Sequence, residues 1–307
     1  ANVLQLFDDR PNNWDAWDID AFYAETGRDV TELSEIRVVE SGPVRGAIEI
    51  VRRFGDSEVR QRVQLLAGSG RVDFVTEAEW HEAHKLLKVS FPVDLNASRA
   101  TFEIQYGHVE RPTHRNTSWD LARFEVVAHK WVDLSEGDYG VALLNDCKYG
   151  HDVLGNTLRL SLLRAPKNPD PNADMGHHRF TYSLYPHAGD LRHGEVVAEG
   201  YRLNVPLRAV PVKPRSGELP AECSFFTVDN PNVFVEVVKR AEREDAWVVR
   251  LYEAHNTRGS VSLSTRLPVE HAYLADLMED PIEEVPVSDG TIRIDIKPFE
   301  IVTLLLR

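Results

Sequence analysis

The sequence predicts an all-β protein, with a large antiparallel β-sandwich (a supersandwich) followed by a smaller C-terminal β-sandwich domain. Long segments alternate branched apolar residues with Arg and Glu, which is the pattern of strands that bury one face. Gly and Pro break these segments at short intervals, for example at Gly42–Pro43 and Gly68–Gly70. Alternating segments with this punctuation are typical of antiparallel sheets packed face to face.

The predicted strands follow the alternation along the chain, and we expect roughly fifteen of them. Helical patterns are few: one short helix is expected within 190–203, and a weaker candidate spans 15–25. The clearest strand segments are 36–54, 58–66, 71–80, 100–106, 124–131, 139–144, 158–163, 180–185, 291–296 and 300–306.

A proline-rich segment divides this pattern into two parts. Pro206–Pro220 contains four prolines and one glycine, a composition typical of a linker. We therefore expect a large β-sandwich domain over residues 1–214 and a smaller β domain over residues 215–307.

Composition and charge exclude several classes of protein. Of the 307 residues, 42% are hydrophobic and 27% are charged, as in globular chains, and the formal net charge is -14. Such a charge argues against binding to nucleic acid or to an anionic membrane, and no segment reaches the roughly 20 apolar residues of a membrane helix. The two cysteines, Cys147 and Cys223, form neither a disulfide framework nor a Cys-rich zinc site, which favours the cytoplasm.

The first residues indicate a piece of a longer polypeptide. The sequence begins with Ala1 and enters a strand-like run, Val3–Phe7, at once. No basic segment followed by an apolar one is present here, so no signal peptide is visible. We expect that an upstream part has been removed.

The densest cluster of polar and aromatic residues is Asp8–Asp20, which holds two tryptophans, five aspartates and one arginine. Indole rings stack on the apolar face of a pyranose, while carboxylates and arginines bond its hydroxyls, so this mixture suits a sugar site. The same composition suits a structural loop in which Asp side chains cap turns. Both interpretations stay open from composition alone.

Other candidates for chemistry are weaker. Carboxylate pairs are plentiful, but their separation, on which glycosidase chemistry depends, cannot be read from a sequence. His81–His84 lacks the spacing of the helical zinc motif. His177, His178 and His187 flank a predicted strand, where a metal role is the less favoured reading. Asn145–Asp152 suits either a binding loop or a hairpin turn.

Many segments together resemble one family, glycoside hydrolase family 38, the α-mannosidases, and within it the cytosolic and bacterial branch. The resemblance covers nearly the whole chain. The segments that carry it are Leu4–Pro11, Trp14–Asp20, His114–Asp120, Arg123–Val126, Ala128–Trp131, Asp133–Glu136, Tyr139–His151, Leu160–Pro166, Asp174–Gly176, His178–Tyr182, Arg250–Ala254 and Lys297–Ile301.

The resemblance implies only the C-terminal β part of such an enzyme. Family members cleave terminal α-mannose with retention, through a covalent mannosyl-enzyme intermediate. Their upstream α/β domain and helical bundle hold the nucleophilic Asp, the acid and the Asp and His ligands of zinc, and none of those motifs appears here. We therefore assign this chain no catalytic residue, no metal ligand and no cofactor of its own, and we expect zinc in the missing catalytic domain.

The resemblance also implies partners and a site. The β part of the family packs on the catalytic domain and lends loops to the edge of the sugar site, so we expect that domain and mannosides as partners, with a homo-oligomer as a further option. The Asp8–Asp20 segment should face the catalytic domain, and in this chain we expect it to be partly mobile, with Trp14 or Trp17 unusually exposed. The candidate residues at the site edge or domain interface are Asp9, Arg10, Trp14, Asp15, Trp17, Asp18 and Arg164.

Two other functions are compatible with the sequence. The chain could be a stand-alone carbohydrate-binding sandwich, or a sandwich whose sheets mediate oligomer assembly. Glycan binding by the isolated chain would favour the first, and a stable dimer without sugar binding would favour the second.

Overall fold

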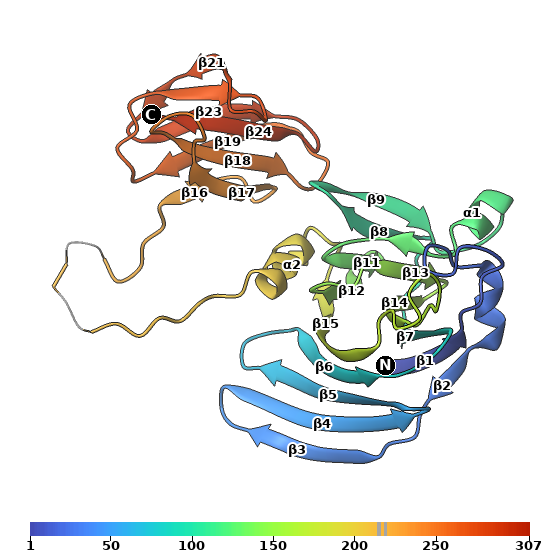
Figure 1. Cartoon of the computed structure of the whole chain (residues 1–307). Helices are drawn as coiled ribbons and strands as arrows, with labels where there is room; N and C mark the ends of the chain where they lie inside the picture. Colours follow the sequence, from blue (N-terminus) through green and yellow to red (C-terminus); the bar gives the residue numbers. More distant parts are fainter. Residues whose placement is uncertain (214–215, 218–219) are drawn as a thin grey trace. The chain divides into compact units, whose positions relative to one another are not determined.

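The computed structural model describes residues 1–213, 216–217 and 220–307 and divides into two compact units (Figure 1). The first unit comprises Ala1–Ile104 and Val109–Leu207, and the second comprises Gln105–His108 and Arg208–Arg307. The predicted boundary at 214/215 falls on residues outside the described ranges, so it stays a prediction.

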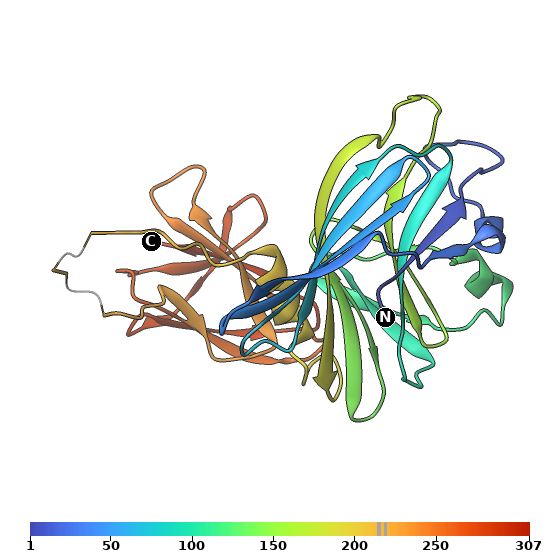
Figure 2. The ribbon, with the colours of Figure 1, turned by 90° about the horizontal axis from the view of Figure 1, so that it is seen from below.

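The first unit contains a six-stranded and a nine-stranded sheet, in which paired strands run antiparallel (Figures 1 and 2). The six-stranded sheet has the order β10 (Val126–Val127), β13 (Gly150–Leu154), β14 (Thr157–Arg164), β7 (Lys85–Pro92), β1 (Val3–Asp8) and β2 (Arg28–Val30). The nine-stranded sheet has the order β3 (Glu35–Ser41), β4 (Arg45–Phe54), β5 (Ser57–Leu66), β6 (Val72–Trp80), β15 (Gly176–Ala188), β12 (Tyr139–Asn145), β11 (Trp131–Ser135), β8 (Arg99–Ile104) and β9 (Gly107–Pro112).

One hydrophobic core fills the space between these sheets, because each sheet turns its alternate apolar residues inward. Strand β6 illustrates the rule: Phe74, Ala78 and Trp80 are buried, whereas Glu77 and Glu79 between them are exposed. The predicted β-sandwich is confirmed for this unit.

The second unit is a smaller all-β sandwich with its own core. One sheet has the order β16 (Phe226–Val228), β19 (Gly259–Thr265), β23 (Thr291–Ile296) and β22 (Val287–Ser288). The other has the order β17 (Val233–Arg240), β18 (Trp247–Glu253), β24 (Ile301–Leu306), β20 (Ala272–Ala275) and β21 (Pro281–Val285).

Several expectations from the sequence need correction. The described residues form 24 strands rather than about fifteen, because short edge strands such as β2, β10 and β22 carry no alternation long enough to detect. The predicted strand 124–131 is largely wrong. In that range only Val126–Val127 pair as β10 and Trp131 begins β11, because the chain here crosses from one sheet to the other.

The helices agree only in part with the predicted segments. Helix α2 (Val196–Asn204) falls almost entirely within the predicted range 190–203 and packs Gly200 closely against Trp131. The candidate at 15–25 yields only the short 3₁₀ helix η1 (Ala21–Thr26), and helix α1 (Ser118–Ala122) was not predicted.

No helix within the described part of the chain has the length and apolar character needed to cross a membrane.

The core of the first unit contains a polar network, and we expect the stability of the unit to depend on one hydroxyl group within it. Tyr182 is fully buried; its hydroxyl donates to Asn2 Oδ1 at 2.6 Å and accepts from Gln61 Nε2 at 2.6 Å. Tyr182→Phe leaves both partners buried without this bond, so we expect a loss of about 1–3 kcal/mol in the free energy of unfolding.

Urea unfolding followed by tryptophan fluorescence measures this loss, since five of the six tryptophans lie in this unit. Tyr185→Phe, on the same strand but half-buried, is the matched control. Equal unfolding midpoints for Tyr182→Phe and the unaltered chain would contradict the prediction.

Candidate functional site

Arg164, the last residue of β14, holds the N-terminal polar segment in place. Its Nε donates to the carboxylate of Asp9 at 2.7 Å. Its two terminal nitrogens donate to the backbone carbonyls of Asp15 at 3.0 Å, Ala16 at 3.3 Å and Asp18 at 2.7 Å. A guanidinium suits this position because its donors form a rigid planar fork, which an ammonium group lacks.

Two further hydrogen bonds attach Arg164 and Asp9 to the neighbouring strands. The Trp80 indole donates to the carbonyl of Arg164 at 2.8 Å, and the Asp9 amide donates to the carbonyl of His84 at 2.9 Å. The side chain of Asp9 is only 1% exposed. Burial raises the pKa of Asp9 above its usual value, although the bond and the charge of Arg164 oppose that effect.

Asp15 ties the same segment to the loop that follows β14. One carboxylate oxygen accepts from the amides of Lys167 at 2.7 Å and Asn168 at 3.0 Å, and the other lies 3.5 Å from Nδ1 of His84. Burial alone would raise the pKa of Asp15, but the two amide bonds lower it below its usual value. The carboxylate of Asp15 therefore positions the backbone.

Both tryptophans of the segment point into solvent. Each side chain is 72% exposed, so the expectation that Trp14 or Trp17 is unusually exposed is confirmed. The Trp14 carbonyl accepts from the amides of Trp17 at 2.8 Å and Asp18 at 2.9 Å, and Trp14 has a φ of 60°. A tight turn that Arg164 fixes thus displays two large aromatic rings on the surface.

The structure brings together only part of the predicted site. Arg164 gathers Asp9 and the backbone of Asp15 and Asp18 into one bonded cluster. Arg10 is exposed, and the exposed Asp18 carboxylate accepts from the next amide, that of Ile19, at 2.9 Å.

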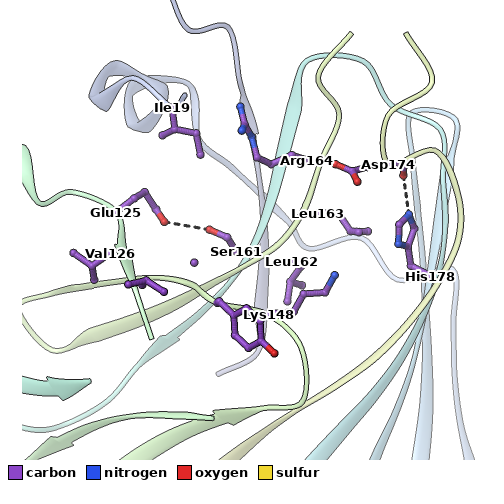
Figure 3. Close-up of a pocket in the computed structure, with 13 residues that line it drawn as sticks. Ile19, Glu125, Val126, Lys148, Ser161, Leu162, Leu163, Arg164, Asp174 and His178 are labelled. Atoms are coloured by element: carbon purple, nitrogen blue, oxygen red, sulfur yellow. Dashed lines mark hydrogen bonds between the residues drawn. The ribbon is translucent and has the colours of Figure 1, made fainter. Parts of the chain in front are cut away.

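A cavity of about 530 Å³ lies beside Arg164 (Figure 3). Its apolar lining includes Ile19, Val126, Leu162 and Leu163, and its polar lining includes Glu125, Lys148, Ser161, Arg164, Asp174 and His178. A concave surface that combines apolar walls with a few polar groups suits a small polar ligand such as a sugar.

Among these polar residues the sequence analysis named Arg164 at the site edge, placed Lys148 in a possible binding loop and weighed His178 for a metal role. The other side chains come from segments far apart in the chain, and no local motif links them. Glu125 accepts a bond from Ser161 at 3.3 Å, and His178 bonds the Asp174 carbonyl at 2.7 Å (Figure 3). His177, His178 and His187 all lie within β15, so the expectation that they flank a strand is wrong.

The loop after β12 also borders the cavity. Strands β12 and β13 belong to different sheets, so Asn145–Asp152 is not a hairpin turn. Asn145 fixes the loop, because its side chain donates to the His129 carbonyl at 2.7 Å and accepts from the Lys148 amide at 2.7 Å. The loop then places Lys148 and Tyr149 in the cavity wall.

Glu125 also belongs to a buried cluster of charged residues centred on Lys88. Lys88 is fully buried, and its ammonium bonds Asp152 at 2.6 Å, Glu125 and the Tyr23 hydroxyl at 3.3 Å. Burial alone would lower the pKa of Lys88, but the two carboxylates raise it above its usual value. Lys88, which stands between apolar neighbours in the strand Lys85–Pro92, was a sequence signal for this cluster.

No group of three or more His, Cys, Asp or Glu side chains is arranged to hold a metal ion anywhere in the described ranges. His81–His84 forms the turn between β6 and β7. There the buried Glu82 accepts from the Ser57 hydroxyl at 2.9 Å and the Asp56 amide at 3.2 Å. The segment is thus a hydrogen-bonded turn and not a helix, as the spacing of its histidines indicated.

Two family models match the chain. "Glycosyl hydrolases family 38 C-terminal domain" covers residues 1–172, and "Glycosyl hydrolases family 38 C-terminal beta sandwich domain" covers residues 232–304. The chain is 47% identical to "Alpha-mannosidase 2C1" of Mus musculus and 42% identical to "Alpha-mannosidase G" of Dictyostelium discoideum. These alignments cover 100% and 99% of the chain but only 30% and 29% of the relatives.

A solved structure shares the fold. The α-mannosidase of Enterococcus faecalis V583 superposes on the whole chain with a TM-score of 0.80, at 18% identity, and the match covers 38% of that protein. The chain thus spans about a third of the length of the proteins it matches.

Removing the guanidinium of Arg164 should release the segment that it holds. In Arg164→Ala we expect the amides of Trp17 and Asp18 to exchange hydrogen more than about tenfold faster, because the turn loses three carbonyl partners and the Asp9 pair. Arg53→Ala, at an exposed arginine of β4, should leave this exchange unchanged. Unaltered exchange in Arg164→Ala, measured by mass spectrometry, would show that other contacts hold the turn.

Removing the ammonium of Lys88 should destabilise the first unit. Lys88→Ala leaves the half-buried carboxylate of Glu125 without its cation and the buried carboxylate of Asp152 with Arg159 alone, which costs about 3–5 kcal/mol. The combined change Lys88→Met, Glu125→Gln and Asp152→Asn should recover much of that loss, because neither carboxylate charge remains and Arg159, which loses Asp152, keeps its bond to Gln5. Urea unfolding of the two variants gives the comparison, and equal losses would contradict it.

The loss of stability in Lys88→Ala should also depend on pH. Burial alone would raise the pKa of Asp152, but Lys88 and Arg159 lower it below the usual value. This lowering stabilises the fold above the ordinary Asp pKa of about 3.9 and is lost as the pH falls. The difference between Lys88→Ala and the unaltered chain should therefore be largest near neutral pH and shrink in acid.

Proposed function

This chain belongs to glycoside hydrolase family 38, as its sequence resemblance predicted, and on that premise we propose that it is the C-terminal part of a retaining α-mannosidase. The names of its relatives support the reaction, because three of them, at 42–47% identity, are α-mannosidases. The chain spans about 30% of their length, so most of such an enzyme lies outside it.

We propose that the Asp8–Asp20 segment and the adjoining cavity form the edge of the sugar site, where the chain meets the catalytic domain. The observation that carries this proposal is the pair of exposed indoles, Trp14 and Trp17, on a turn that Arg164 holds rigidly. An indole face stacks on the apolar face of a pyranose, and a fixed ring loses little conformational entropy on binding.

The chain's own residues would position and shield the substrate rather than react with it. Asp9 and Arg164 hold the turn, and the cavity wall places Glu125 and Lys148 where they can bond sugar hydroxyls. Water excluded from this edge strengthens polar interactions in the adjoining catalytic centre. We place the attacking carboxylate, the acid and the zinc site in the preceding catalytic domain.

We further propose a cytoplasmic enzyme. Cys147 and Cys223 are free and exposed, which suits a reducing compartment. We also propose a domain boundary near residue 215, and we propose that the enzyme assembles into a homo-oligomer.

The role of the indoles can be tested in the complete enzyme. Trp14→Ala combined with Trp17→Ala should lower kcat/KM for an α-mannoside by more than tenfold, which corresponds to about 1.4 kcal/mol of transition-state binding. Tyr139→Ala removes an exposed aromatic ring from the other sheet and should leave kcat/KM unchanged. Unchanged kinetics in the correctly folded double variant would make the segment purely structural.

A second test uses the 307-residue chain alone. We expect that it binds no stoichiometric zinc and does not hydrolyse an α-mannoside, because the catalytic carboxylates and zinc ligands belong to the preceding domain in this proposal. Metal analysis after dialysis against zinc and a chromogenic mannoside assay provide the measurement. One zinc per chain, or clear turnover, would refute the assignment.

A further inference from the structure

Three arginines line a second, smaller cavity, which shares Val126 with the cavity beside Arg164. The cavity has a volume of about 20 Å³, which is room for one small group. Arg111 comes from β9, Arg115 from the loop before α1, and Arg123 directly follows α1. The remaining lining includes Phe102, His114, Asp120, Phe124, Val126 and Asp152.

Arg111 carries a polar atom that lacks a partner. Its Nη1 is inaccessible to solvent and makes no hydrogen bond to any described residue. Its guanidinium stacks on the ring of Phe102, with 4.6 Å between the guanidinium carbon and the ring centroid. A buried donor without an acceptor is costly and rare, so a group that accepts its bond is expected beside it.

The neighbouring charges leave the cavity positive. Within the described ranges, none of Arg111, Arg115 and Arg123 forms an ion pair, although the chain carries a net charge of -14. Burial and the charge of Arg123 lower the pKa of Arg111, as expected when like charges lie close together.

The two carboxylates of the lining are already engaged. Asp120 accepts from the Thr117 amide at 3.2 Å in the capping box of α1. Asp152 bonds Lys88 at 2.6 Å and Arg159 at 2.9 Å. Asp120 also lies 3.7 Å from Nδ1 of His114, and neither carboxylate forms an ion pair with any of the three arginines.

The backbone that carries the arginines is held in place. The Thr113 hydroxyl donates to the Ala97 carbonyl at 2.7 Å, and the Thr113 carbonyl accepts from the Gly155 amide at 2.7 Å. With Phe102 fixing the plane of Arg111, much of the cost of ordering that side chain is met before a ligand arrives, whereas Arg123 is exposed.

We propose that this cavity binds an oxyanion, a phosphate or carboxylate group, through Arg111, Arg115 and Arg123. The guanidinium fork matches the paired oxygens of either group, and each carries the negative charge that the three arginines need as a partner. The anion is either a free phosphate-class ion or a carboxylate side chain from another part of the longer polypeptide. The first source does not depend on the proposed function.

Titration calorimetry with inorganic phosphate, against chloride at equal ionic strength, tests the site in the 307-residue chain. We expect saturable binding of one phosphate per chain. Arg111→Gln and Arg123→Gln should each weaken it at least about tenfold, because each removes a charged donor. Arg99→Gln, at an exposed arginine paired with Glu110, should leave it unchanged.

Both variants should fold, because each relieves repulsion, and their melting temperatures without phosphate should equal or exceed that of the unaltered chain. Absence of saturable binding to the unaltered chain, or equal binding to Arg111→Gln and Arg99→Gln, would overturn the proposal.

The same titration on the complete polypeptide identifies the source of the anion. Binding to both proteins supports a free anion. Binding to the 307-residue chain but not to the complete polypeptide supports a carboxylate that already fills the cavity there.

Discussion

The candidate site depends on one guanidinium. Arg164 stands at the end of β14, where the hydrogen-bond ladder of the sheet stops, and it bonds one buried carboxylate and three backbone carbonyls. The rigid sheet is thereby extended into a segment that has no regular structure of its own. Without this bonding, the turn around Trp14 would have little to hold it, because its two indoles contribute almost no burial.

A second buried cation, Lys88, holds residues of the cavity wall in place. Lys88 lies on the same sheet, and through Glu125 and Tyr23 it anchors two segments that cross the sheet's outer face. Buried ions are expensive, so their presence under a concave surface indicates positioning rather than stability alone. The sandwich is thus a support on which buried charges hold the polar groups of the turn and of the cavity wall in place.

The sequence predicted the sandwich because alternation leaves a direct trace in strands such as β6 and β12. It predicted the exposed tryptophans of the Asp8–Asp20 segment from their cost and the family resemblance. It missed the cavity, because Glu125, Lys148 and Asp174 meet only after the two sheets have packed. It named Asp15 as a candidate residue but could not show that the Asp15 carboxylate bonds the amides of Lys167 and Asn168. Bonds between side chain and distant backbone leave no pattern in a sequence.

We propose that the turn held by Arg164 faces the catalytic domain at the sugar site. Hydroxyl-radical footprinting of Trp14 and Trp17 tests this placement in the 307-residue chain and in the complete polypeptide with and without a bound mannoside analogue. We expect rapid oxidation of both indoles in the chain, slower oxidation in the complete polypeptide and further protection by the analogue. Equal oxidation of both indoles in all three samples would contradict it.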